Sequence, residues 1–282
     1  MGANGGSPLP FKPNVHGVLI RIRFRTPTIR FDEDSAWGTV VGELYIGTSG
    51  YTYKDWRGIF YPKGTPQKAW LSFYAQHYNT VEINATFYRS FPKSVFERWF
   101  ESTPDAFRFT LKGPRQITHY SQLHDIGNDL KEFIKSAAGL KDKLSVMLWQ
   151  FPAKAKASTL LERLTGFLPL LPTHVRQVFE FRHTSWFNEA IYDLLNEYNA
   201  GWVINDSSRF PAREVIAGDF MYVRFHGPGK LYASLYTTEQ LRRWAEKIRP
   251  RLAEMDVYAY FNNDYGGRAL RNADELRTLL GA

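Results

Sequence analysis

The segment VFEFRH, residues 178–183, is a short run of mainly apolar residues that ends in charged and polar ones. Seven further runs share this form: LYIGTS (44–49), TVEINA (80–85), FRFTLK (107–112), LSVMLWQ (144–150), WVIND (202–206), MYVRFH (221–226) and VYAYFNND (257–264). A helix-like stretch follows each run. Strands buried on both faces are near-continuously apolar, and eight strand-helix repeats are typical of a parallel barrel. The sequence therefore predicts an α/β fold, a (β/α)₈ TIM barrel.

The chain length fits one barrel with an amino-terminal extension. Residues 43–282 form the predicted barrel, close to the roughly 250 residues of a typical one. Residues 1–42 form the predicted extension, which we expect to be partly disordered because residues 1–13 are rich in Gly and Pro. The stretch VLIRIRFR from Val18 alternates apolar residues with arginine, as a strand does. Three interpretations stay open for this extension: an additional strand, a start codon placed too far upstream, or an amphipathic targeting peptide.

Composition excludes several kinds of site. The chain has no cysteine, which excludes disulfides, thiolate metal sites and a cysteine nucleophile. No apolar stretch approaches the roughly 18 residues of a membrane span, and we expect a cytoplasmic protein without a membrane partner. Walker, dinucleotide-binding and serine nucleophile-elbow motifs are absent. The net charge of +8 is compatible with a phosphate-bearing substrate or with nucleic acid, and requires neither.

Polar side chains at the carboxyl ends of the strands mark the predicted site, because these ends build the active site of a barrel. Residues two apart on a strand point the same way, so Glu82 with Asn84, Glu180 with Arg182, and Arg224 with His226 form pairs. The full set is Ser49, Glu82, Asn84, Lys112, Gln150, Glu180, Arg182, His183, Asp206, Arg224, His226, Asn262, Asn263 and Asp264. A purely structural salt-bridge network is the alternative interpretation of this set.

The segments that follow the first, second and fifth predicted strands are rich in aromatic residues. We expect Trp56, Tyr88 and Trp186 to border the site, where they could stack on a base or a sugar. Packing on the barrel rim is the alternative for the same residues. Trp70, Trp99 and Trp244 lie in helix-like stretches, so we expect them to pack on the outside of the barrel.

Several of these segments carry a family resemblance. GTSGYTYKDWRGIFYP, EINATFYRSFP, FTLKGPRQITH, LWQFP, FEFRHTSWF, YVRFHG and YAYFNNDYGGRA occur in order from Gly47 to the carboxyl end. Together they resemble the YecE-like family, catalogued as domain of unknown function 72. The resemblance implies a (β/α)₈ barrel and identifies the same strand ends as the site, but it implies no particular reaction.

We assign the expected roles from the chemistry of the groups. Glu82 or Glu180 is the expected general base and His226 the acid, with Asp206 as a further catalytic candidate. We expect Arg182 to neutralise Glu180 and Arg224 to bind substrate phosphate. The expected substrate-binding residues are Trp56, Asn84, Tyr88, Lys112, Gln150, Arg182, Trp186, Arg224, Asn262 and Asn263.

Whether the protein binds a divalent metal ion as a cofactor stays open. Glu180, His183, Asp206, His226 and Asp264 could supply nitrogen and oxygen ligands. The cations Lys112, Arg182 and Arg224 in the same region would repel a metal ion and attract an anion.

The resulting hypothesis is an enzyme that acts on a phosphate-containing or otherwise anionic substrate, with nucleic acid as the specific choice. Metal-assisted phosphoester hydrolysis, as in a nuclease, is one route. The alternatives are a carbohydrate or phosphosugar enzyme and a non-catalytic nucleic-acid-binding barrel. A retaining glycosidase ranks lower, because Glu82 and Glu180 lie three strands apart and are expected to be far from each other.

Overall fold

The computed structural model describes residues 42–282. The predictions for the amino-terminal extension fall almost wholly outside these residues and stay predictions. The described part contains the eight predicted strands, each within two residues of its expected start.

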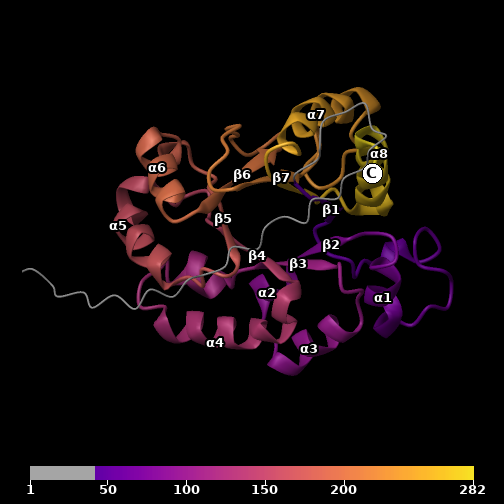
Figure 1. Cartoon of the computed structure of the whole chain (residues 1–282), viewed down its shortest axis with the longest axis horizontal. Helices are drawn as coiled ribbons and strands as arrows, with labels where there is room; N and C mark the ends of the chain where they lie inside the picture. The colour runs from indigo at the N-terminus through magenta and orange to yellow at the C-terminus, as the bar shows by residue number, and fades with distance from the viewer. Residues whose placement is uncertain (1–41) are drawn as a thin grey trace, which may run out of the picture. The chain divides into compact units, whose positions relative to one another are not determined.

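The strands form one parallel sheet that curves around a common axis (Figure 1). They are β1 (Leu44–Thr48), β2 (Thr80–Ile83), β3 (Arg108–Lys112), β4 (Leu144–Gln150), β5 (Arg176–Glu180), β6 (Ala200–Asp206), β7 (Phe220–Phe225) and β8 (Asp256–Phe261). Their order is β1-β8-β7-β6-β5-β4-β3-β2, and every hydrogen-bonded pair is parallel. This confirms the predicted fold of the TIM-barrel type.

Side chains, rather than a ladder of backbone bonds, join β1 to β2. The Tyr74 hydroxyl accepts a hydrogen bond from the Thr48 backbone N–H at 2.9 Å and donates one to the Thr80 carbonyl at 3.1 Å. At the other end of the seam the Asn79 amide donates to the Leu44 carbonyl at 2.7 Å. Gly47 permits this close approach, because a Cβ atom there would lie 2.2 Å from the Thr80 carbonyl oxygen. The barrel is therefore nearly closed, and Tyr74 bridges its last gap.

Helices cover the outside of the barrel (Figure 1). They are α1 (Trp70–Tyr74), α2 (Ala85–Tyr88), α3 (Lys93–Glu101), α4 (Gly127–Ala137), α5 (Ala157–Phe167), α6 (Glu189–Glu197), α7 (Thr238–Arg251) and α8 (Arg268–Leu280), with a π-helical turn, η3, at Gln116–Tyr120. One expectation was wrong: β6 and β7 are joined by residues 207–219, which contain no helix. Two helices, α2 and α3, instead follow β2. Across residues 42–282, every helix is too short or too polar to cross a membrane.

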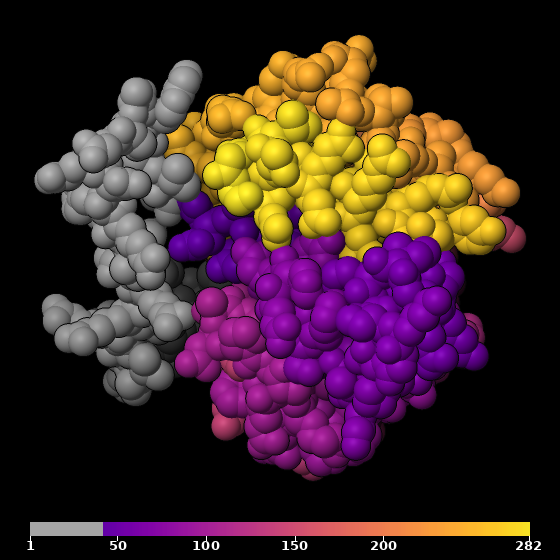
Figure 2. Space-filling view, turned by 90° about the vertical axis from the view of Figure 1, so that its right-hand side faces the viewer, coloured from indigo at the N-terminus to yellow at the C-terminus, as the bar shows by residue number. Residues whose placement is uncertain are grey.

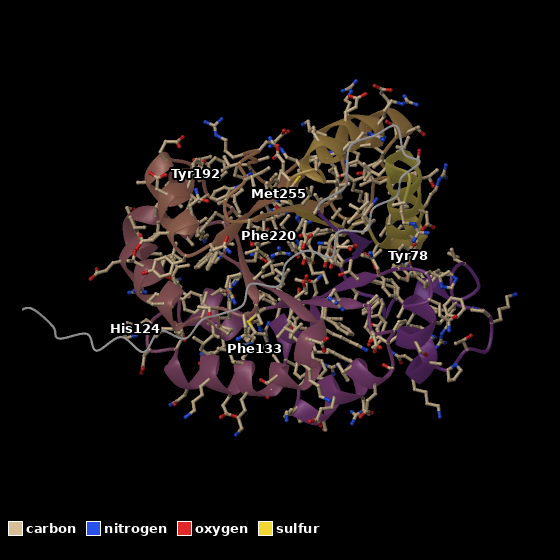
Figure 3. All side chains as sticks on the ribbon, in the orientation of Figure 1. Tyr78, His124, Phe133, Tyr192, Phe220 and Met255 are labelled. Atoms are coloured by element: carbon tan, nitrogen blue, oxygen red, sulfur yellow. The ribbon has the colours of Figure 1, made fainter. Side chains whose placement is uncertain are left out.

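Two apolar clusters hold the fold. The inner cluster fills the barrel and consists of Val146, Leu148, Val178, Val203, Phe220, Tyr222, Tyr258 and Tyr260, with Tyr45 packed against it. The outer cluster lies between strands and helices; Phe133 of α4 packs on Trp149, and Tyr192 of α6 packs on Trp202. Figure 3 shows Phe220 among the strands and Phe133 and Tyr192 beside the helices. The predicted packing of Trp70, Trp99 and Trp244 on α1, α3 and α7 is confirmed.

The last helix packs beside the first described segment and so completes the ring. Figure 2 shows α8, in yellow, against the indigo segment that contains β1 and α1. Tyr78 donates to the Leu270 carbonyl at 3.3 Å, and Arg277 donates to the His77 carbonyl at 2.6 Å. Both bonds link α8 to the residues just after α1.

Candidate functional site

Strand alternation decides which polar side chains enter the barrel. In β2 to β5, β7 and β8 the even-numbered residues point inward at the carboxyl ends, as Tyr222, Tyr258 and Tyr260 of the inner cluster do, whereas β6 points the odd-numbered Val203 inward. The inward polar residues among those predicted from the sequence are therefore Glu82, Asn84, Lys112, Gln150, Glu180, Arg182, Arg224, His226 and Asn262. We call this set the barrel mouth. It brings together most of the residues predicted from the sequence.

Arg224 is the centre of the mouth. Its guanidinium donates to Glu82 from Nε at 3.0 Å and from Nη2 at 2.6 Å, and it donates to Glu180 from Nη1. Tyr222 adds a bond to Glu82 at 2.7 Å, and Arg182 Nε donates to Glu180 at 2.5 Å. Glu82 and Glu180 are fully buried and Arg224 is 1% exposed. Two cations and two anions thus form one buried, hydrogen-bonded chain.

This network corrects two expectations. We expected Arg224 to carry unpaired positive charge for substrate phosphate, whereas it is paired with two carboxylates. We also expected Glu82 and Glu180 to be far apart, whereas both contact the same guanidinium. The expected pairing of Arg182 with Glu180 is confirmed. Burial raises the pKa of Glu180, but Arg182 and Arg224 outweigh it and hold that pKa well below the usual range. Glu180 is therefore ionised, and a carboxylate whose pKa is so low is a weak base, which argues against its expected role as general base.

Lys112 differs from the arginines because it has no partner. It is 7% exposed, and no hydrogen bond or ion pair joins its Nζ atom to any described residue. The Nζ atom lies 4.2 Å from the centre of the Phe87 ring. Burial, followed by the charge of Arg224, lowers the pKa of Lys112 to about 7. A substantial fraction of this amine is therefore neutral near pH 7.

His226 is fixed as a neutral ring. Its Nε2 atom donates to Asn205 Oδ1 at 3.1 Å, and its Nδ1 atom accepts from Asn262 Nδ2 at 3.1 Å. Burial and the nearby Arg224 lower the pKa of His226 well below its usual value. The expected role as general acid would require a proton on Nδ1, which both effects oppose. Asn205 was missed from the sequence, although its parity with inward-pointing Val203 identifies it.

We predict that His226 stays neutral, with the proton on Nε2, from pH 8 down to pH 5. The unfolded chain binds a proton at this residue below about pH 6.5, and the folded protein does not. Stability should therefore fall with decreasing pH by up to about 1.4 kcal/mol per unit from this residue. Nitrogen-15 NMR of the imidazole checks the tautomer, and melts of His226→Asn should show a weaker loss in acid. A ring that titrates near pH 6.5 would contradict the assignment.

Three predicted residues, Asp206, His183 and Asn263, make their side-chain bonds outside the mouth. Asp206 accepts a bond from Trp244 Nε1 on α7, and burial raises its pKa. Asn263 donates to Asn272 on α8 at 2.9 Å, and His183 Nδ1 accepts from the Ser185 backbone N–H at 3.1 Å. Asp264 follows β8; its backbone carbonyl accepts from Trp56 Nε1 at 3.1 Å, and its carboxyl group lies near Tyr53 and Glu82. Within residues 42–282 no three His, Asp or Glu side chains are grouped to hold a metal ion. The geometry thus gives no support to the metal set.

The predicted tryptophans occupy packing positions. Trp56 is fully buried among Tyr53, Phe60 and Tyr61. Trp186 is also fully buried; its Nε1 atom donates to the Ala155 carbonyl at 2.8 Å, and its ring stacks on Phe181. Neither indole is placed to stack on a ligand. The rim-packing alternative describes both residues better.

Tyrosine and arginine side chains form an exposed cluster beside the mouth. Tyr88 and Tyr120 are each 63% exposed. The Arg115 guanidinium lies 5.7 Å from the Tyr88 ring centre and 5.3 Å from the Tyr120 ring centre. Only Tyr88 was predicted; its exposure is what a stacking role requires. We call Tyr88, Arg115 and Tyr120 the rim cluster.

Buried polar atoms without partners occur on residues that follow β1, β2 and β8. Among the described residues they include Ser49 Oγ, Asn84 Oδ1, Asn263 Oδ1 and Asp264 Oδ1. Burial raises the pKa of Asp264 well above its usual value. Buried polar groups are normally hydrogen-bonded, so such a group of orphans indicates where a ligand or water would supply bonds.

Comparison with known proteins gives the family. A family model described as "Protein of unknown function DUF72" matches residues 45–282. The chain belongs to the DUF72 family. This confirms the resemblance seen in the sequence.

Relatives within the DUF72 family support the same conclusion. The chain is 27% identical over 274 aligned residues to the UPF0759 protein YunF of Bacillus subtilis, covering 84% of this chain and 94% of YunF. It is 31% identical to the UPF0759 protein YecE of Escherichia coli over 144 residues, half of YecE and 51% of this chain. A crystal structure of a DUF72 family protein from Thermotoga maritima superposes with a TM-score of 0.77 at 29% identity. That match covers 85% of this chain and all of the other.

Proposed function

We propose that this DUF72 protein is an enzyme that binds a phosphate-containing substrate across the carboxyl ends of its strands, with single-stranded nucleic acid as the preferred class. The observation that carries the proposal is the rim cluster, in which an arginine lies between two exposed tyrosines. Exposed aromatic rings stack on bases without regard to sequence, and arginine pairs with phosphate.

The charge of the surrounding loops supports this choice. We define the rim loops as the segments that follow the strands: residues 49–66, 84–92, 113–126, 151–156, 181–188, 207–212, 226–237 and 262–267. Their exposed basic residues are Lys54, Arg57, Lys63, Arg89, Lys154, Lys156, Arg209 and Lys230, whereas their exposed acidic residues are Asp55 and Asp125. Basic residues therefore outnumber acidic ones at the end of the barrel that holds the site, which favours a polyanion.

More exposed tyrosines extend the stacking surface around the mouth. Tyr232 follows β7 and is 38% exposed, and Tyr265 follows β8 and is 68% exposed with Arg268 against its ring. Phe210, after β6, covers Arg182 at 3.8 Å and lies against His226. Aromatic groups spaced around a basic rim suit a chain of nucleotides better than one small sugar.

We predict that Tyr88→Ala and Arg115→Ala each weaken binding of a fluorescent single-stranded oligonucleotide. Loss of one stacked base should cost about 1–3 kcal/mol, or roughly 5- to 150-fold in Kd. Fluorescence anisotropy at several salt concentrations measures both the affinity and its salt slope. Arg115→Ala should also reduce that slope.

Matched controls lie at the other end of the barrel. Tyr198 is 37% exposed and lies two residues before β6, and Arg98 is exposed on α3. Tyr198→Ala and Arg98→Ala should leave the affinity nearly unchanged. Equal losses in controls and rim variants would contradict the proposed surface. A sugar phosphate that binds as tightly as the oligonucleotide would favour the phosphosugar alternative.

A substitution in the barrel mouth can distinguish catalysis from binding. Glu82 remains the expected base, because its carboxylate faces the inside of the barrel, where Tyr222 and Arg224 hold it in place. If the protein is an enzyme, the Glu82→Gln variant should still bind the oligonucleotide but should lose turnover. Oligonucleotide binding without turnover in the parent protein would favour the non-catalytic module.

A further inference from the structure

Two lysines are buried in the described part of the chain, and they differ in one respect. Lys143 is 2% exposed, and its Nζ atom donates to the carbonyls of Phe100 and Thr103 at 2.6 Å each. Lys112 is 7% exposed and donates to no described group. Lys143 is therefore a structural lysine whose ammonium is satisfied. Burial removes water from the Lys112 amine, and no described group replaces the lost hydrogen bonds. Such a buried amine is unusual unless it has a function.

The surroundings of Lys112 favour a neutral amine. Burial acts first, and the positive charges of Arg224 and Arg182 oppose protonation. Glu180 and Glu82 act in the opposite direction, but their oxygens are already engaged by the arginines. Desolvation and nearby cations are the two factors that activate a lysine as a nucleophile.

The neighbouring histidines carry no charge that would stabilise the protonated amine. His119, on η3, has its pKa lowered to about 4 by burial and by Lys112, and His226 is held neutral as described above. The Nζ atom lies 4.2 Å from the centre of the Phe87 ring, whose face stabilises a cation but accepts no proton.

The Lys112 amine can also reach a ligand. It stands at the carboxyl end of β3, where barrel enzymes place their reacting groups. The residue keeps 7% of its surface exposed there. Thr86 fixes the backbone here by donating to the Lys112 carbonyl at 2.7 Å, and a Cβ on Gly113 would lie 2.4 Å from the Trp149 ring. The amine therefore projects from a rigid base.

We propose that Lys112 is a nucleophile that forms an imine with an aldehyde or ketone substrate. The neutral amine adds to the carbonyl carbon, so that a carbon–nitrogen bond forms and the carbonyl oxygen takes up a proton. Loss of that oxygen as water then gives the imine, and no oxidant or reductant is needed. This inference goes beyond phosphate recognition and does not depend on nucleic acid binding.

Reductive trapping tests the inference on the parent protein. Limiting pyridoxal phosphate is added, borohydride reduces any imine to a stable secondary amine, and peptide mass spectrometry locates the adduct. We expect Lys112 to react faster than any other lysine, with a rate that reaches half its maximum near pH 7. A lysine of ordinary pKa has on the order of one amine in 2,500 unprotonated at that pH, so the preference over exposed lysines should reach tens- to hundreds-fold. Lys143 is the buried control and should stay unlabelled.

Two further trapping experiments identify the class of carbonyl compound with which Lys112 reacts. One uses glyceraldehyde 3-phosphate and the other an oligonucleotide with an abasic site, whose sugar carries an aldehyde. An adduct on Lys112 in the first arm assigns a small phosphorylated substrate, and one in the second assigns damaged nucleic acid. Absence of Lys112 adducts with all three carbonyl compounds, or labelling only above pH 9, would overturn the inference. Failure of intact oligonucleotides to bind would affect the proposed function alone.

Discussion

Arg224→Met should lower the stability of the protein more than any other charge-removing substitution in the mouth. The change leaves Glu82 and Glu180 fully buried beside one fewer cation, and Glu82 loses its only ion pair among the described residues. Breaking a buried ion pair in this way costs about 3–5 kcal/mol. For a domain of this size the melting temperature should fall on the order of 10 °C. Thermal melts at pH 7 measure the effect.

A surface pair provides the control for Arg224→Met. Arg242 contacts Glu239 at 2.6 Å, but both side chains are more than half exposed. Arg242→Met should therefore cost no more than about 1 kcal/mol. Adding Glu82→Gln and Glu180→Gln to Arg224→Met should restore part of the loss, because the uncompensated charges disappear. Equal melting temperatures for Arg224→Met and Arg242→Met would show that the network does not carry stability.

Gly47→Ala should destabilise the barrel strongly, because it opens the seam between β1 and β2. The added Cβ would lie 2.2 Å from the Thr80 carbonyl oxygen and 3.0 Å from the Tyr74 hydroxyl. A backbone carbonyl cannot move aside as a side chain can, so the two strands must separate and the bridge through Tyr74 must weaken. Overpacking of this kind costs roughly 3 kcal/mol. Denaturant unfolding measures the loss.

Gly166→Ala is the matched control for the seam. Gly166 lies in α5, and a Cβ there would meet no atom within 4 Å. Alanine has the higher helix propensity, so this variant should be unchanged or more stable by up to about 1 kcal/mol. If Gly47→Ala unfolds at the same denaturant concentration as Gly166→Ala, the tight seam is not needed for the barrel.

Most of the barrel was predictable because strands buried on both faces leave a clear apolar pattern. VFEFRH at residues 178–183 gave the end of β5, and the i, i+2 pairs gave the inward side of the mouth. The connection of residues 207–219 was not predictable in this way, since polar loops and short helices have similar compositions. The helix expected there is replaced by a connection without helix or strand.

The misassigned site residues have a different cause. Asp206 follows Asn205 directly, and one residue along a strand decides whether a side chain enters the barrel or faces α7. The register of a strand depends on how it pairs with its neighbours, which the sequence of that strand alone does not show. The partners of Arg224 were hidden for a related reason, because barrel closure brings Glu82 and Glu180 to one guanidinium from strands far apart in sequence.

The most direct test of the proposed substrate surface is photocrosslinking of a single-stranded oligonucleotide that contains 5-iodouracil, followed by peptide mapping. Iodinated bases crosslink to the aromatic rings on which they stack. The account predicts crosslinks at Tyr88 or Tyr120 of the rim cluster, and loss of the Tyr88 product in Tyr88→Ala. Crosslinks at Tyr198, at the opposite end of the barrel, with none on the rim loops, would contradict it.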